Sequence, residues 1–197
     1  MSDSPREVPE AQAQLVALAR LAETVATTLP AAVAELAALV EATLRGGGKL
    51  LFCGNGGSAA DAQHLAAEYV VRFARERRPL AAMALTTDTS VLTAGGNDYG
   101  FEAVFERQVR ALARPGDLLL LHSTSGESEN LLRAADAARA QGVGTAALLA
   151  KGGGRLRHRV DLALVIPTDV TARAQELHLA VGHVVCDMVE RSLAERP

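Results

Sequence analysis

The nine residues LLFCGNGGS at positions 50–58 constrain the fold of this chain more than any other stretch. An apolar run ends in a glycine-rich turn, residues 54–58, and an alanine-rich segment with helical periodicity follows. Such a strand–turn–helix unit lets the backbone approach a ligand closely, and its free N–H groups and helix dipole favour an anion. The stretch therefore predicts an α/β unit with an anion site, although a tight turn without a ligand explains the glycines as well.

The rest of the chain repeats this alternation of apolar runs and helical patterns. Strands are predicted at residues 49–53, 80–85, 117–121, 143–149 and 162–166. Helices are predicted at residues 58–75, 101–113, 129–141 and 172–193, with one or two helical turns at 88–94. Strands separated by helices form a parallel sheet covered on both faces, so we expect a three-layer α/β sandwich with five strands.

Two further helical patterns precede the first strand. Apolar residues recur at helical spacing from Leu15 to Leu29, and Pro30 suits the first turn of a second helix that stops at Gly46. We expect an antiparallel helical hairpin after a disordered tail over residues 1–9. The predicted division is thus 1–46 for tail and hairpin, and 47–197 for a single folded unit.

Composition limits the classes of function. The 197 residues carry a formal net charge of −3, which gives no electrostatic reason to expect a nucleic-acid or anionic-membrane partner. No stretch is long and apolar enough to suggest a membrane span, and residues 1–10 lack the apolar core of a signal sequence, so neither is expected. The two cysteines, Cys53 and Cys186, both lie in apolar patterns and are expected to be buried thiols. We therefore expect a cytoplasmic protein.

Polar loops follow three of the predicted strands, at residues 54–58, 95–100 and 122–128. Ligands of parallel sheets bind beyond the carboxyl ends of the strands. In the loop Ser123-Thr124-Ser125-Gly126-Glu127-Ser128, hydroxyls and free N–H groups at a helix start favour phosphate binding, because capping explains only one of four hydroxyls. Catalysis by these serines is not expected, because strand alternation directs His122 away from Ser123.

A second group of polar residues lies on two helices. His64 and Glu68 are four residues apart and share a helix face, as a metal pair, an acid/base pair or a surface ion pair. The last helix adds Gln175, Glu176, His178 and His183, and spacing alone aligns Glu176 with His183 better than Gln175. Two such helices resemble the halves of a site for a metal such as zinc.

Three further residues are explained either by ligand binding or by an ordinary position on the surface or in a turn. Arg72, one predicted helical turn beyond Glu68, is either a surface residue or a ligand for a phosphate or carboxylate. Asn97 and Asp98, in the predicted loop 95–100, form either a simple turn or a contact to sugar hydroxyls.

Five strings of the sequence resemble the bacterial phosphoheptose isomerases of the sugar isomerase (SIS) domain family, in order from about Gly47 to Val189. They are CGNGGSAADAQHLAAE, ALTTDTSVLTAGGNDYGF, RQVRALARPGD, STSGES and AQELHLAVGH. The resemblance implies a five-stranded SIS domain and a homotetramer with active sites at subunit interfaces. It also implies conversion of sedoheptulose 7-phosphate to D-glycero-D-manno-heptose 7-phosphate, an early step toward heptose-containing glycans.

The resemblance also implies roles for individual residues. One zinc ion per subunit would be held by His64, Glu68, Gln175 and His183, which selects Gln175 over Glu176. Glu68 would be the base and His183 the acid of an enediol mechanism, with zinc polarising the oxygens. Substrate would contact Asn55, Gly56, Gly57, Ser58, Glu68, Arg72, Asn97, Asp98, Ser123, Thr124, Ser125, Ser128 and Gln175.

Departures from the family pattern keep two alternatives open. Glu127 stands where Asn is common, His122 is uncommon, and the loop at 151–154 is shortened. One alternative is an isomerase for another sugar phosphate. The other is a non-catalytic relative of the type that binds the replication initiator DnaA, which lacks part of the zinc and acid/base set; Glu68 and His183 argue against it. A DNA-linked sugar-phosphate sensor is disfavoured, because the chain shows no helix-turn-helix and no basic stripe.

Overall fold

The computed structural model describes residues 4–194 and contains all five predicted strands. The strands are β1 (Leu50–Gly54), β2 (Ala82–Ala84), β3 (Leu118–Ser123), β4 (Gly144–Leu149) and β5 (Leu162–Val165). They form one sheet in the order β2-β1-β3-β4-β5, and every neighbouring pair is parallel. The expected α/β sandwich is confirmed.

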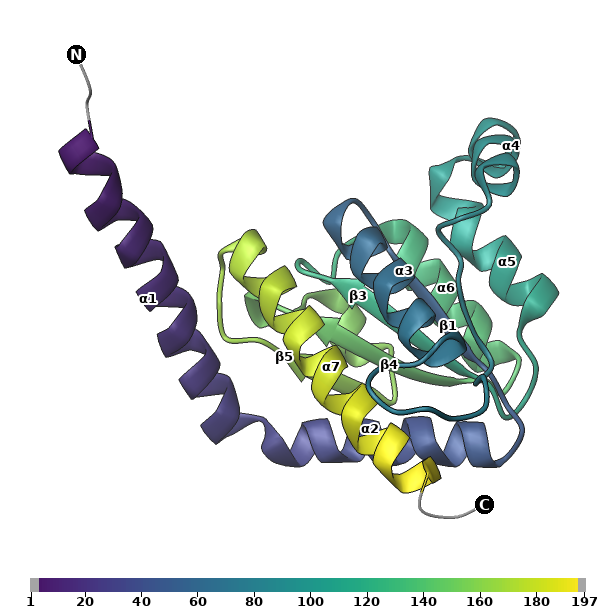
Figure 1. The fold of residues 1–197 in the computed structure, drawn as a ribbon. Coiled ribbons are helices and arrows are strands. Elements are labelled where there is room, and N and C mark those ends of the chain that lie inside the picture. Colours follow the sequence, from purple (N-terminus) through teal and green to yellow (C-terminus); the bar gives the residue numbers. More distant parts are fainter. Residues whose placement is uncertain (1–3, 195–197) are drawn as a thin grey trace.

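Helices cover both faces of this sheet (Figure 1). The helices are α1 (Ser4–Thr28), α2 (Pro30–Arg45), α3 (Gly57–Val70), α4 (Thr89–Tyr99), α5 (Val104–Leu112), α6 (Glu129–Ala140) and α7 (Thr171–Ala194). Short 3₁₀ turns occupy Phe101–Ala103, Lys151–Gly153 and Arg155–His158. Helices α2, α3 and α7 pack on one face, and α5 and α6 pack on the other.

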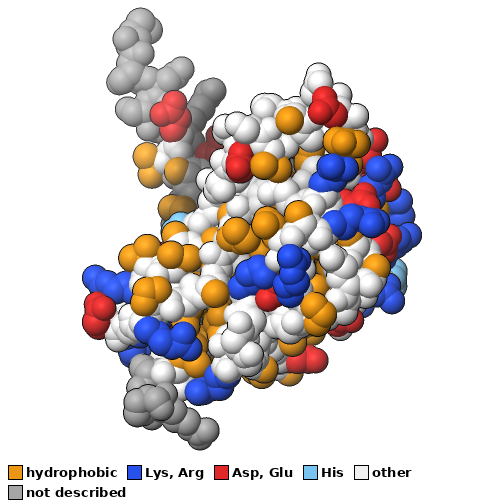
Figure 2. All heavy atoms as spheres, turned by 90° about the vertical axis from the view of Figure 1, so that its right-hand side faces the viewer, with side chains coloured by type: hydrophobic (Ala, Val, Ile, Leu, Met, Phe, Trp, Pro, Cys, Tyr) orange, Lys and Arg blue, Asp and Glu red, His pale blue; other side chains and the backbone are white. Residues whose placement is uncertain are grey.

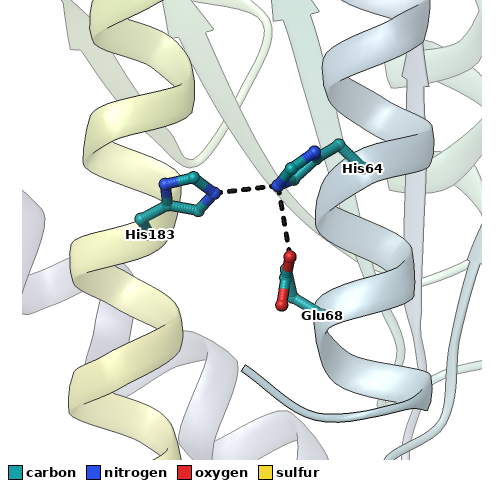
Figure 3. A group of neighbouring side chains, drawn as sticks. All are labelled: His64, Glu68 and His183. Atoms are coloured by element: carbon teal, nitrogen blue, oxygen red, sulfur yellow. Dashed lines mark hydrogen bonds and ion pairs between the residues drawn. The ribbon is translucent and has the colours of Figure 1, made fainter. Parts of the chain in front are cut away.

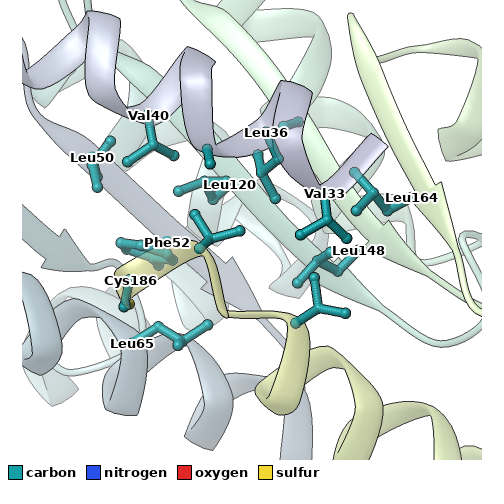
Figure 4. Close-up of a cluster of buried hydrophobic side chains, with 14 of the residues drawn as sticks. Val33, Leu36, Val40, Leu50, Phe52, Leu65, Leu120, Leu148, Leu164 and Cys186 are labelled. Carbon is teal, nitrogen blue, oxygen red and sulfur yellow. The ribbon is translucent and has the colours of Figure 1, made fainter. Parts of the chain in front are cut away.

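Two hydrophobic clusters, one on each face, hold the layers together. Strand β3 shows the division, because Leu118 and Leu120 belong to the cluster under α2, α3 and α7, whereas Leu119 and Leu121 belong to the other. Figure 4 shows the first cluster, in which side chains from α2 interlock with those of the sheet. Helix α2 is thus part of the core, and the predicted boundary between residues 46 and 47 stays a prediction.

The two N-terminal helices are present, but they do not fold back on each other. They meet at a bend of 73°, and α1 projects away from the body (Figure 1). Only Leu29 separates them, and one residue is too short for an antiparallel turn. The predicted disorder is wrong for residues 4–9, which begin α1, and residues 1–3 lie outside the described part. Among the described residues, no single helix combines the length and apolar composition needed to cross a membrane, whereas α1 and α2 pass that test only as a bent pair.

Two predicted helix boundaries are wrong, and both affect candidate residues. Helix α3 ends at Val70, so Arg72 lies beyond the helix rather than one turn along it. Helix α4 continues through residues 95–99, where a loop was expected. Asp88 caps this helix, because its carboxylate accepts the Val91 N–H at 3.0 Å.

The strand order places a ligand crevice at the middle of the sheet. From β1 the chain crosses to the edge strand β2 and then returns to β3, on the other side of β1. Loops that leave neighbouring strands in opposite directions open a crevice at the carboxyl ends of those strands. Here the loops after β1 and β3 start side by side, because Gly54 pairs with His122.

Candidate functional site

A pocket of about 310 Å³ lies where the loops after β1 and β3 meet. Its lining residues are Asn55, Gly56, Gly57, Ser58, His122, Ser123, Thr124, Ser125, Ser128, Leu131, Thr171 and Gln175. We call it the loop pocket. Its lining contains hydroxyls, amides, backbone, the His122 imidazole and the Leu131 side chain, but no Lys, Arg, Asp or Glu. Any anion bound there would be held by neutral donors.

Three helices begin at the loop pocket. Helix α3 starts at Gly57, α6 starts after Ser128, and α7 starts at Thr171, and all three residues line the pocket. The first N–H groups of a helix have no partner within it, and the helix dipole adds positive potential there. The convergence of three such ends makes the loop pocket suited to a phosphate group.

The loop after β3 is held in shape by its own hydroxyls and by a neighbouring loop. Ser123 Oγ accepts the Gly126 N–H at 3.0 Å, and Ser125 Oγ accepts the Glu127 N–H at 3.2 Å. Gly126 has a φ of 67°, and a Cβ there would lie 1.9 Å from the carbonyl oxygen of Gly153. Only glycine fits at position 126, so this loop and the one around Gly153 interlock.

The charge on Glu127 is paired outside the loop pocket. Its carboxylate accepts the backbone N–H of Arg155 at 2.9 Å and the Arg155 Nε–H at 2.7 Å. These hydrogen bonds lower the pKa of Glu127, so the group is a carboxylate bound to a guanidinium. Because Glu127 is not among the pocket residues, the departure from the usual Asn adds no unpaired charge to the lining.

His122 lines the loop pocket but is almost fully buried, and it packs toward Phe52, with ring centroids 6.2 Å apart. Burial, together with the neighbouring His178, lowers the pKa of His122 to about 3. The ring is therefore neutral at physiological pH.

Asn130, which the sequence analysis missed, supports the turn after β1. Its side-chain amide exchanges two hydrogen bonds of 2.9 Å with the amide of Asn55. Asn130 is buried in the first turn of α6, so the pair ties the two pocket loops together. A polar residue at a helix start directly after the loop was the available signal for this role.

A second cluster lies between α3 and α7 and contains His64, Glu68 and His183 (Figure 3). His64 Nε2 is 2.9 Å from His183 Nε2 and 3.2 Å from Glu68 Oε1. Phe73 also packs against His183, with ring centroids 5.4 Å apart. The structure thus brings together three of the four expected ligand residues, including both expected catalytic residues.

The donor atoms of this cluster fit a single metal ion. All three ligand atoms lie within 4.8 Å of one another. Two nitrogens bound to one tetrahedral zinc ion lie about 3.3 Å apart, which is close to the 2.9 Å between the two imidazoles. Burial of His183, and then the nearby His64, lower the pKa of His183, while Glu68 acts in the opposite direction. A neutral imidazole is the form that can bind a metal.

Gln175 and Glu176 are directed to different places. Gln175 lines the loop pocket, and its amide packs closely against Gly57. A Cβ added to Gly57 would lie 2.5 Å from Gln175 Nε2. Glu176 pairs with Arg173 at 2.6 Å and does not join the histidine cluster. The spacing-based preference for Glu176 is therefore wrong, and the role of Gln175 as a metal ligand stays a prediction.

Three predicted substrate residues lie outside both clusters. Arg72 is exposed beyond the end of α3. Asn97 and Asp98 are exposed on α4, where Asn97 Nδ2 donates to Asp98 Oδ1 at 2.7 Å. Contacts from these residues to a substrate stay predictions.

Comparison with protein families and curated proteins gives consistent results. The SIS domain model matches residues 15–150. A phosphoheptose isomerase from Rhodospirillum rubrum is 56% identical over 162 residues, which is 82% of this chain and 86% of the relative. A phosphoheptose isomerase from Roseiflexus sp. is 57% identical over 172 residues, 87% of each chain.

Solved structures agree with these relatives. The phosphoheptose isomerase GmhA from Neisseria gonorrhoeae superposes with a TM-score of 0.87 at 42% identity, covering 93% of this chain and 98% of the other. A phosphoheptose isomerase from Francisella tularensis gives a TM-score of 0.91 at 37% identity, covering 94% and 98%.

Proposed function

This chain belongs to the phosphoheptose isomerase family of SIS-domain proteins and is an isomerase, and we propose that it converts sedoheptulose 7-phosphate to D-glycero-D-manno-heptose 7-phosphate. The observation that carries this proposal is the pairing of two sites on α3. The helix starts in the uncharged loop pocket at Gly57 and presents His64 two turns later, about 10 Å along its axis. That separation suits an extended sugar with phosphate at one end and a carbonyl at the other.

In this proposal the phosphate occupies the loop pocket. The hydroxyls of Ser123, Thr124, Ser125 and Ser128 and the starts of three helices supply neutral donors. The backbone of Gly56 and Gly57 can approach a ligand closely, because neither residue has a side chain. Asn55, held by Asn130, would orient the sugar end of the phosphate ester.

The reaction then needs a base and an acid at the carbonyl end. Glu68 would take a proton from the hydroxyl-bearing carbon next to the ketone, while His183 would donate a proton to the ketone oxygen, giving the enediol. The reverse transfers, onto the other carbon and from the other hydroxyl, would give the aldose. Burial is the main cause that lowers the pKa of His183, so its resting ring is neutral near pH 7 and its remaining N–H can hydrogen-bond the ketone oxygen.

We propose that the metal is zinc, one per subunit, held by His64, Glu68, Gln175 and His183. Two imidazoles and a carboxylate are donors that zinc accepts, and the first three side chains already converge. When bound, zinc would polarise the substrate oxygens and so acidify the adjacent C–H. In this arrangement Glu68 would have to divide its charge between the metal and the proton it removes.

We also propose a homotetramer with active sites at its interfaces. An apolar groove of about 410 Å³ lies between α1, α2 and α7, and Val184 and Met188 are exposed there at 50% and 39%. Helix α1 also exposes Leu15 at 67%. A second subunit would cover these apolar side chains. Arg72, Asn97 and Asp98 lie outside this groove, and in this proposal they would contribute to active sites at the interfaces of the tetramer.

A cytoplasmic location and the absence of nucleic-acid or membrane partners stay predictions. Figure 2 shows the face that carries α4 and α5, where basic and acidic side chains are interspersed over this part of the surface. A face without a basic stripe gives no support to phosphate-backbone binding there.

The test is turnover of sedoheptulose 7-phosphate by purified protein, with added zinc and with a chelator. Zinc-dependent aldose formation would support both substrate and metal. Turnover of another ketose or aldose phosphate in a substrate panel, without turnover of the heptulose, would move the assignment to another sugar. A protein that binds zinc but turns over none of them would refute the proposed reaction.

A further inference from the structure

The segment that follows α3 is held by one buried carboxylate on α7. Glu190 is 1% exposed, and its oxygens accept the backbone N–H groups of Phe73 at 3.0 Å, Ala74 at 2.8 Å and Arg75 at 2.7 Å. Burial by itself would raise the pKa of Glu190, but these three donors and Arg77 outweigh it and lower the pKa. The group is therefore a fully paired carboxylate inside the protein.

Arg77 connects the same carboxylate to the end of α3. Its Nε lies 3.1 Å from Glu190 Oε1, and the two side chains are only 6% and 1% exposed. Its other nitrogens donate to the carbonyl oxygens of Glu68, at 2.7 Å, and Tyr69, at 2.9 Å. The carbonyls of a helix's last turn have no partner within the helix, so Arg77 caps α3 at the residue that carries the expected base.

Both connections lead to the histidine cluster. Glu190 follows His183 by seven residues, so the two side chains share one face of α7. His183 contacts α3 through His64, and Glu190 contacts the segment that follows α3. Phe73, whose N–H is bound by Glu190, packs its ring against His183. One carboxylate thus fixes the residue that covers His183 and, through Arg77, the helix turn that carries Glu68.

We propose that Glu190 and Arg77 are positioning residues, which set the separation and orientation of Glu68 and His183 across the α3–α7 contact. The inference rests on the acid/base roles proposed above. It predicts that loss of this buried pair lowers kcat and weakens metal binding more than it affects substrate affinity, since neither residue lines the loop pocket.

The test compares Glu190→Gln with Asp187→Asn. Asp187 also joins α7 to the segment after α3, through Arg75 at 2.9 Å, but it is solvent-accessible and touches neither Arg77 nor the helix end. For Glu190→Gln we expect kcat to fall about 10- to 100-fold with KM within about 2-fold. The dissociation constant for zinc, measured by titrating the apoprotein with the metal, should rise about 10- to 100-fold, because the ligands on α3 and α7 would no longer be held at a fixed separation. For Asp187→Asn both should stay within about 2-fold.

Two results would overturn the inference. One is a folded Glu190→Gln protein with wild-type kcat and zinc affinity. The other is an equal loss in the Asp187→Asn control. If Glu190→Gln does not fold, Phe73→Leu provides the test, because it removes the ring that packs on His183 and changes no charge. About a 10-fold loss of kcat at unchanged KM would support the inference, and wild-type kcat would refute it.

The proposed reaction and the positioning role of Glu190 can fail independently. If the unmodified protein fails to turn over the heptulose phosphate, the proposed reaction is wrong. The zinc affinities of the same variants need no turnover and still decide whether Glu190 positions the cluster.

Discussion

Replacing Gly126 by alanine tests the interlock of the two pocket loops. The backbone at Gly126 has a φ of 67°, and an added Cβ would meet the Gly153 carbonyl oxygen at 1.9 Å, where ordinary contacts begin at 3.4 Å. An L-residue in the left-handed region costs about 1–2 kcal/mol. The clash is with backbone, so it cannot be relieved by a side-chain rotation, and overpacking of this kind adds about 1–3 kcal/mol.

Gly142→Ala is the matched control. Gly142 has a φ of 70°, but nothing lies within 4 Å of its Cβ position. It should therefore lose only the conformational part, about 1–2 kcal/mol. For a chain of this length each kcal/mol lowers Tm by about 2–4 °C, so we expect a loss of about 4–20 °C for Gly126→Ala and about 2–8 °C for the control.

Calorimetry of both variants, with steady-state kinetics at a temperature where both are folded, measures the two consequences. Because displacement of the 123–128 loop removes phosphate contacts, Gly126→Ala should also raise KM about 10-fold or more, while Gly142→Ala leaves KM unchanged. Equal unfolding temperatures in the two variants would refute the interlock. A lower Tm without a change in KM would show that the loop does not hold the phosphate.

Four further predictions concern single side chains. Ser125→Ala should raise KM more than it lowers kcat, because Ser125 lines the loop pocket, and an unchanged KM in steady-state assays would count against phosphate binding there. Glu68→Gln should lower kcat by about 10²- to 10⁴-fold in a protein with wild-type circular dichroism, and wild-type turnover would remove Glu68 from the mechanism. Asp117→Asn should cost about 2 kcal/mol of unfolding free energy at pH 7, because the carboxylate binds the Lys49 ammonium and the backbone N–H groups of Lys49 and Arg114. These bonds outweigh burial and lower the pKa of Asp117, so the stabilisation is present above about pH 4 and is lost as pH falls through the lowered pKa. Urea unfolding measured at a series of pH values should therefore show a smaller loss of stability in acid for the variant than for the unmodified protein. Val184→Glu, in the apolar groove, should reduce the mass seen by light scattering, and an unchanged mass would exclude this groove from the interface.

The strands could be predicted because their apolar runs are continuous. Residues of β3 are buried on both faces, and a run such as Leu118 to Leu121 has no polar position that would suit a solvent-exposed face. Parallel pairing then followed from the intervening helices. The loop pocket was predictable for the same reason, since both of its loops directly follow such strands.

The end of α3 could not be predicted, because a distant residue sets it. The apolar pattern of α3 continues past Val70, but the N–H groups of Phe73, Ala74 and Arg75 donate to Glu190 instead of to helical carbonyls. In α4, two adjacent glycines suggest a break. The cap at Asp88 favours the helix, and the Thr93 hydroxyl, which donates to the Thr89 carbonyl oxygen at 2.6 Å, is accommodated within it.

The two halves of the histidine cluster could be located from the sequence, but the residues that support them could not. The spacing of His64 and Glu68 places both on one helix face, whereas their contact with His183 depends on how α3 packs against α7. Arg77 lies in a run of charged residues that resembles solvated surface, and Glu190 is marked as buried only by its position relative to His183. A carboxylate two full turns after His183, on the face that must be buried against α3, was the one available signal.

The uncharged lining of the loop pocket has a consequence for selectivity in the cell. A cluster of lysines or arginines attracts any polyanion over a Debye length, and its affinity falls as ionic strength rises. Helix ends and hydroxyls attract an anion only at short range, so they bind a group that already fits between them. We expect substrate affinity to change little with salt concentration, and we expect nucleotides and nucleic acid to compete only weakly. Because the lining provides no electrostatic steering, the association rate should be slower than for a basic site.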